Sequence, residues 1–227
     1  MIEHLLDKVP EKTHRKFIEI MYPEFGLPNR PSPIQIIMGA RYTSYFKTYE
    51  DNRKPVIEID ATNTTFSATP ANLKKLICKL QTETAHETAH YLHYLTNPQF
   101  YRLKNKEIAN KIHQLREITA ELGAISFISK IGKLRQYLDY SRKEGYYEVT
   151  QFANRLYQRG QKIDELARMT VEQASPLLKE YSKSLSRKQE TKVKPKNKNR
   201  AKLKPEEPFT LELDNIEEFI VIKAGAA

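Results

Sequence analysis

The sequence predicts an α+β fold in which a small sheet precedes a set of helices. Three short runs between residues 33 and 60 are rich in β-branched and aromatic residues, and turn-forming residues separate them. Two long stretches, 70–96 and 99–130, then carry apolar residues at helical spacing. Shorter helical patterns continue to residue 185. We therefore expect an antiparallel or mixed sheet followed by helices.

The N-terminal part begins with an amphipathic helix. Residues 10–22 have apolar residues at helical spacing and a proline in the first turn. The strand candidates that follow are 33–39, 42–49 and 55–60. Because their connections are short, they favour an antiparallel meander.

The stretch 70–96 is expected to be one long helix, with Thr69 as its cap and Pro70 at its first position. At 100° per residue, five apolar side chains fall on one side of this helix: Leu73, Ile77, Leu80, Tyr91 and Leu95. His86, His90 and His93 fall together on the opposite side. The helix can therefore bury its apolar face and present a stripe of histidines.

The second long helix, 99–130, follows directly after Asn97-Pro98, so the two helices should form an antiparallel pair. Further helical segments are expected at 132–139, 148–157 and 163–185. We assign residues 1–186 to one domain, 187–208 to a disordered basic linker, and 209–227 to a short acidic β-like segment.

The composition restricts the possible covalent links, metal sites and cellular location of the protein. Cys78 is the only cysteine among 227 residues, which excludes an internal disulfide and a cysteine-based zinc site. The N-terminus lacks the pattern of a secretory signal, and no apolar run approaches the length of a membrane span. The sequence therefore predicts a cytoplasmic protein with no membrane partner.

The net charge of +10 is concentrated near the C-terminus. Residues 183–204 carry +9, whereas residues 205–227 carry −5. We interpret the basic segment as a solvated linker or as a non-specific contact for nucleic-acid phosphates. A third interpretation is that the acidic end folds back onto the domain and obstructs its cleft.

The motif His86-Glu87-Thr88-Ala89-His90 carries most of the functional information. Histidines four residues apart lie on the same face of a helix and can bind one metal ion. Glu87 is then placed beside the ion, where it can take a proton from a water activated by the metal. This is the HExxH pattern of zinc hydrolases.

A third zinc ligand must come from elsewhere in the chain. No histidine occurs after His113, and His93 lies too far along the helix from His86 to share the ion. The metzincin pattern is excluded because it needs glycine at position 93 and histidine at position 96. The remaining candidates are Glu117 and Glu121 on the second long helix, where small residues allow close helix packing: Ala120, Gly123 and Ala124.

With Glu117-Ile-Thr-Ala120, the motif resembles the gluzincin branch of zincin-like metallopeptidases, in particular the ImmA/IrrE-type and minimal single-domain members. The resemblance covers roughly residues 33–130. It implies a zincin-like fold with His86, His90 and Glu117 as zinc ligands and Glu87 as general base. The sequence departs from the family pattern in two places. Glu121 stands where asparagine is more common, so it is the alternative ligand, and Thr88-Ala89 replaces Leu-Gly.

The expected activity is that of an intracellular zinc endopeptidase acting on a peptide or protein. The alternative is a nucleic-acid-associated binding protein on the same scaffold, with vestigial or secondary catalysis. Candidates for lining the cleft or stabilising an oxyanion are His93, Tyr137, Tyr140, Tyr146 and Tyr147. Asp60 and Glu58 are candidates for orienting a ligand histidine.

Overall fold

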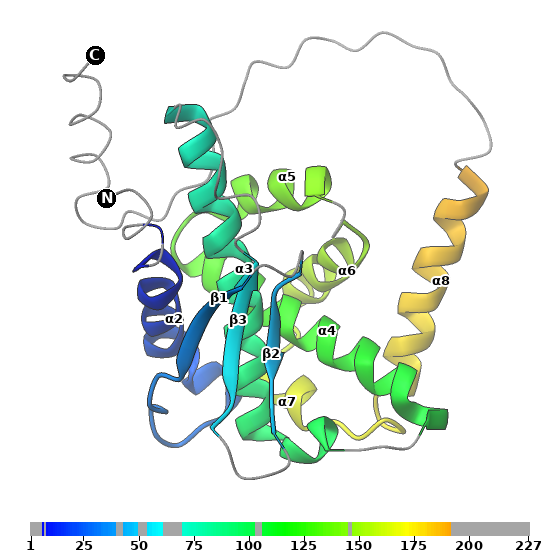
Figure 1. Ribbon diagram of the computed structural model, residues 1–227. Coiled ribbons are helices and arrows are strands. Elements are labelled where there is room, and N and C mark those ends of the chain that lie inside the picture. Colours follow the sequence, from blue (N-terminus) through cyan, green and yellow to red (C-terminus); the bar gives the residue numbers. More distant parts are fainter. Residues whose placement is uncertain are drawn as a thin grey trace, which may run out of the picture.

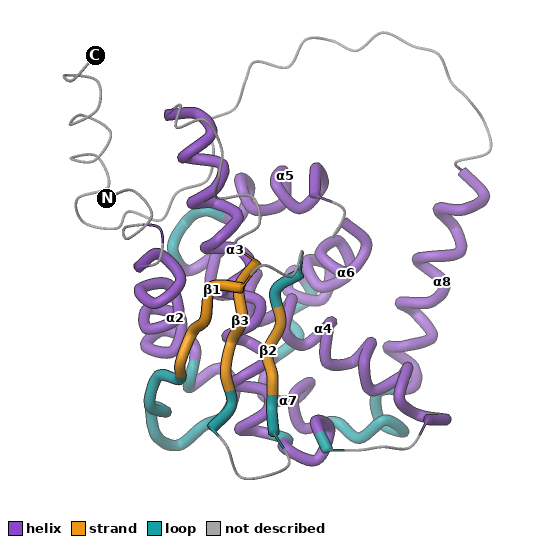
Figure 2. Tube along the Cα trace, viewed as in Figure 1, coloured by secondary structure: helices purple, strands orange, loops and turns teal. Residues whose placement is uncertain are grey.

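The computed structural model has the predicted α+β architecture, with helices packed against a small sheet (Figures 1 and 2). It describes Leu6 and residues 8–39, 43–49, 54–60, 70–102, 106–144 and 147–191. The predicted acidic β-like segment and most of the predicted basic linker lie outside these residues. The α+β class is therefore confirmed for the described part of the chain.

The sheet has three strands, β1 (Gln35–Gly39), β2 (Tyr45–Lys47) and β3 (Val56–Asp60), in the order β1-β3-β2. β3 is parallel to β1 and antiparallel to β2, so the sheet is mixed. The predicted antiparallel meander is wrong, because β1 and β2 pair with β3 and not with each other. β3 takes the centre because its residues are buried on both faces of the sheet.

Helix α3 (Pro70–Thr96) runs through the middle of the molecule and has the predicted bounds. It contacts helix α2 (Lys8–Met21), helix α4 (Lys106–Lys130) and the sheet (Figure 1). Ile77, Leu80 and Tyr91 of its predicted apolar side are buried, but Leu95 is exposed near the end of the helix. Nearly all residues from Thr84 to His93 are buried, so the motif lies at the core of the fold.

His14 ties α2 to α3 and to the chain just before β1. One ring nitrogen, Nε2, accepts a hydrogen bond from the Ile34 N–H at 3.1 Å. The other, Nδ1, therefore carries the proton and donates it to Thr88 Oγ1 at 2.9 Å. Thr88 in turn donates to the Thr84 carbonyl. Thr88, a residue inside the motif, thus links α3 to α2 through His14.

Helices α3 and α4 pack closely and run in opposite directions across their contact, as predicted. A Cβ built on Gly123 of α4 would lie only 3.0 Å from the Ala89 Cβ and 2.9 Å from Phe25 Cζ. Glycine at this position therefore lets α4 approach the histidine helix. The predicted start of α4 at residue 99 is wrong, since a short 3₁₀ helix, η2 (Pro98–Tyr101), turns the chain first.

The remaining helices cover the outer side of α4. They are α5 (Leu134–Glu144), α6 (Tyr147–Gln158), α7 (Ile163–Arg168) and α8 (Ser175–Thr191). The single helix predicted over 163–185 is divided in two, because the backbone is extended at Met169. α8 also continues to Thr191, past the predicted start of the linker. None of the helices in the described ranges is long and apolar enough to cross a bilayer.

Candidate metal centre

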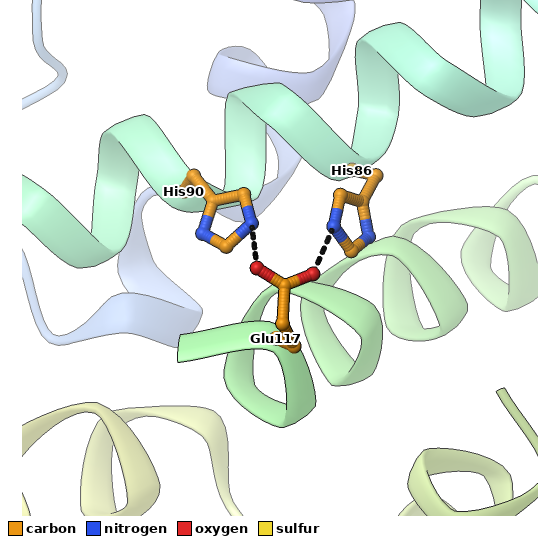
Figure 3. Close-up of side chains that lie close together, drawn as sticks. All are labelled: His86, His90 and Glu117. Carbon is orange, nitrogen blue, oxygen red and sulfur yellow. Dashed lines mark hydrogen bonds and ion pairs between the residues drawn. The ribbon is translucent and has the colours of Figure 1, made fainter. Parts of the chain in front are cut away.

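Three side chains from α3 and α4 converge on one point (Figure 3). The Nε2 atom of His86 lies 3.3 Å from one carboxylate oxygen of Glu117, and the Nε2 atom of His90 lies 3.3 Å from the other. The helical spacing of four residues puts both imidazoles on the side of α3 that faces α4. The structure therefore brings together His86, His90 and Glu117, the first set of ligands inferred from the sequence.

The second nitrogen of each imidazole has its own partner. His86 Nδ1 lies 3.0 Å from Glu121 Oε2, and the other oxygen of Glu121 accepts a hydrogen bond from Tyr137. His90 Nδ1 lies 3.2 Å from the Tyr101 hydroxyl, which itself donates to the His90 carbonyl. When both Nδ1 atoms donate, both Nε2 atoms keep a free lone pair for a metal.

The donor set fits a zinc ion. Two imidazoles and one carboxylate form a common catalytic zinc site, with a fourth position left for water. Zinc–ligand bonds of about 2.0–2.2 Å in a tetrahedron separate the ligand atoms by roughly 3.3 Å. Each His Nε2 lies at about this distance from a Glu117 oxygen, one histidine facing each oxygen, and one donor atom from each residue lies within 4.8 Å of the others. The group can hold a metal ion.

The pKa values of Glu117 and His86 reflect the closeness of these groups. Burial raises the pKa of Glu117, but the charge of His90 and the hydrogen bonds from both histidines outweigh burial and hold this pKa well below its ordinary range. Burial lowers the pKa of His86, but the carboxylates of Glu117 and Glu121 outweigh it and raise this pKa well above 6.5. A metal binding at this point would take the place of a proton on His86.

The cluster opens into a cavity of about 340 Å³ between β2, α3, α4 and α5. Glu87, which is 7% exposed, lines this cavity beside the two histidines. Glu83, one turn earlier on α3, also lines it and accepts a hydrogen bond from Ser44. Burial raises the pKa of Glu83 to about 7, against the opposing effects of Ser44 and Lys79. The wall of the cavity therefore carries several carboxyl groups, of which that of Glu83 is partly protonated near neutral pH.

Other predicted site residues lie in different places. Glu121, the alternative ligand, is a partner of His86 Nδ1 and stands behind that histidine. His93 is fully buried against Phe100 and Tyr101 and does not line the cavity, so its predicted place in the cleft is wrong. Burial lowers the pKa of His93 to about 3, so it is a neutral core residue.

The predicted tyrosines divide into two groups. Tyr137 and Tyr140 line the cavity, and the hydroxyl of Tyr137 is engaged by Glu121. Tyr147 lies on α6 and borders a separate small pocket with Arg155, which none of the candidate metal ligands lines. The expectation that it reaches the cleft is therefore wrong. Tyr146 lies outside the described residues.

The predicted supports for the histidines, Asp60 and Glu58 on β3, have other partners. Asp60 forms an ion pair with Lys79 at 2.6 Å, and Glu58 accepts a hydrogen bond from Tyr45. The supports are Glu121 and Tyr101 instead. Glu121 could have been found from its spacing of one turn from Glu117, whereas Tyr101 comes from the turn after α3 and carries no sequence signal.

No family model matches the sequence, and comparisons with curated proteins and with solved structures also give no match.

Proposed function

We propose that this chain is a zinc-dependent metallopeptidase with a zincin-like fold of the gluzincin type. The observation that carries the proposal is the geometry of His86, His90 and Glu117, with each Nε2 atom 3.3 Å from a Glu117 oxygen. The partners on the Nδ1 atoms support it, because they leave the Nε2 lone pairs free for a metal.

The residues of the cavity have separate roles in the proposed reaction. A zinc ion held by the three ligands supplies Lewis acidity, which lowers the pKa of a bound water and polarises a carbonyl. Glu87 accepts the proton of the attacking water and then delivers it to the leaving amine nitrogen. Glu121 and Tyr101 hold the two histidines in one tautomer and orientation.

The walls of the cavity favour a peptide as substrate. Thr43, Ser44, Tyr45 and Phe46, in and next to β2, also line the cavity. A strand beside a site is suited to an extended peptide, which can align with it along its backbone. The cavity is also open to solvent, and its volume of about 340 Å³ lies within the range of ligand pockets.

The variant Glu87→Gln tests the proposal, because it removes the proton acceptor and keeps the metal ligands. We expect it to retain zinc by metal analysis and to lose hydrolysis of a denatured protein substrate. Glu165→Gln, on the exposed surface of α7, is the matched control and should keep both properties. Full hydrolysis by zinc-loaded Glu87→Gln would contradict the proposed role of Glu87.

A further inference from the structure

Arg116 brings a positive charge to the cavity that contains the candidate metal ligands His86, His90 and Glu117. It precedes Glu117 on α4 and lines the cavity together with His90 and His113. The other charged residues of this wall are mostly acidic: Glu83, Glu87, Glu117 and Glu121. A guanidinium is permanently charged, so Arg116 keeps one corner of the cavity cationic at any physiological pH.

The guanidinium is held in place by an aromatic ring and not by a carboxylate. Its central carbon lies 4.0 Å from the centroid of the Tyr101 ring, in a cation–π contact. Among the residues that the structure describes, no carboxylate lies within ion-pairing distance of Arg116. Its Nε atom is buried and has no hydrogen-bond partner in that part of the chain. The Tyr101 side chain also accepts a hydrogen bond from Arg116. The Nε donor of Arg116 is left unused by the described residues.

The nearby carboxylates do not supply the missing partner. Both oxygens of Glu117 face the two histidines, and those of Glu121 face His86 and Tyr137. A half-buried cation without a carboxylate partner is costly, and arginine has a planar fork of donors that matches a carboxylate in a bidentate pair. The group that best completes this arrangement is a carboxylate from outside the chain.

We propose that Arg116 binds a carboxylate of the substrate and so sets its specificity. The inference rests on the proposed peptidase function, since the carboxylate belongs to the peptide that occupies the cavity. Two parts of a peptide carry this chemistry: the C-terminal carboxylate and the side chain of an aspartate or glutamate. Either one, paired with Arg116, would fix the position of the peptide relative to Glu117 and the metal.

The experiment measures binding on the zinc-loaded Glu87→Gln chain, so that the peptide is not cleaved. Acetylated short peptides are compared in two matched pairs, one with a free-acid or amidated C-terminus and one with an internal glutamate or glutamine. We expect the carboxylate member of one pair to bind roughly ten- to hundredfold more tightly than its neutral partner. The pair that shows the difference identifies the source of the carboxylate.

Variants of Arg116 assign the preference to this residue. In Arg116→Met the preference should disappear, and in Arg116→Lys part of it should remain because the charge is kept. Arg155→Met is the matched control, since Arg155 also lies over an aromatic ring, that of Phe152, but outside the cavity. It should keep the full preference. If Arg116→Met unfolds early or loses zinc, Arg116→Gln provides the same test with a polar side chain.

Equal affinity within both pairs, including the absence of binding by all four peptides, would overturn the proposal. A preference that survives in Arg116→Met or Arg116→Gln would also overturn it. Failure of the proposed function has a different signature: the wild-type chain would bind zinc or peptide without hydrolysing any substrate. The binding preference is measured with hydrolysis disabled, so the two failures are distinguishable.

Discussion

At the scale of single residues, the candidate metal site depends on the hydrogen-bond partner of the Nδ1 atom of each histidine. His86 is oriented by Glu121, which is itself fixed by a hydrogen bond from Tyr137. His90 is oriented by Tyr101, whose hydroxyl also contacts His93. Such outer partners hold the ring in the correct tautomer and raise its basicity, so they contribute to metal affinity without touching the metal.

Glu121→Gln tests the role of the outer partner on His86. The variant loses the negative charge that faces Nδ1, so zinc affinity should fall by roughly 10- to 100-fold while the three ligands remain. Competition with a zinc-binding dye measures the change. Glu83→Gln is the control, because Glu83 lies in the same cavity but contacts Ser44 and Lys79 instead. Equal zinc affinity of Glu121→Gln and wild type would show that Glu121 does not tune the site.

The sequence predicts the ligands better than their supports. His86, Glu87 and His90 follow from a local spacing on one helix. The next helix offers Glu117 and Glu121 as third ligand, and the sequence leaves the choice between them open. Tyr101 and Arg116 could not be predicted, since their positions depend on how η2 returns the chain toward α3 and α4. The prediction that His93 lines the cleft fails for the same reason. The aromatic residues that bury its side of the helix come from η2.

At the scale of elements, the site exists only where α3 and α4 come close together. Gly123 permits this approach, because even a methyl group there would press against Ala89 and Phe25. The distance between the helices determines whether a carboxylate on α4 can reach imidazoles on α3. Packing and metal binding are therefore coupled at this contact.

Gly123→Ala should weaken both properties. Overpacking a tight contact costs about 1–3 kcal/mol of unfolding free energy, and the displaced α4 should also carry Glu117 away from the histidines. Urea denaturation and zinc titration measure the two effects. Lys111→Ala, on the exposed face of the same helix, should change stability by less than about 0.5 kcal/mol. Wild-type stability of Gly123→Ala would contradict the proposed close packing.

Element boundaries are predicted where the sequence carries a clear signal. α3 begins at Pro70 and ends at Thr96, just before Asn97-Pro98, as predicted, whereas the predicted cap Thr69 lies outside the described residues. Ser175-Pro176 is a similar start signal for α8, although the pattern 163–185 suggested one continuous helix. The strand order β1-β3-β2 could not be predicted, because it reflects the burial of β3 on both faces and not any local turn.

At the scale of the whole molecule, buried neutral histidines make the fold sensitive to acid. Burial, with a smaller contribution from the Arg15 charge, lowers the pKa of His14 to about 4 from its ordinary 6.5. The unfolded chain therefore binds a proton at higher pH than the folded chain. The stability that His14 contributes is present above pH 6.5 and is lost as the pH falls toward 4.

The loss attributable to His14 is on the order of 3 kcal/mol across that interval. In His14→Gln, which cannot titrate, the fall in unfolding free energy between pH 6.5 and 4 should be smaller by this amount. Denaturation at a series of pH values measures both profiles, and their difference removes the contribution of the other histidines. Parallel profiles for the two proteins would show that His14 is not buried in its neutral form.

We propose that α3 and α4 together form a zinc site. Metal analysis of the purified chain, supplied with zinc and then dialysed, tests it most directly. We expect about one zinc per chain in the wild type. Zinc should be lost in the double variant His86→Ala with His90→Ala and kept in His113→Ala, whose side chain is largely exposed. A wild-type chain that holds no zinc, or a double variant that still holds it, would contradict the account.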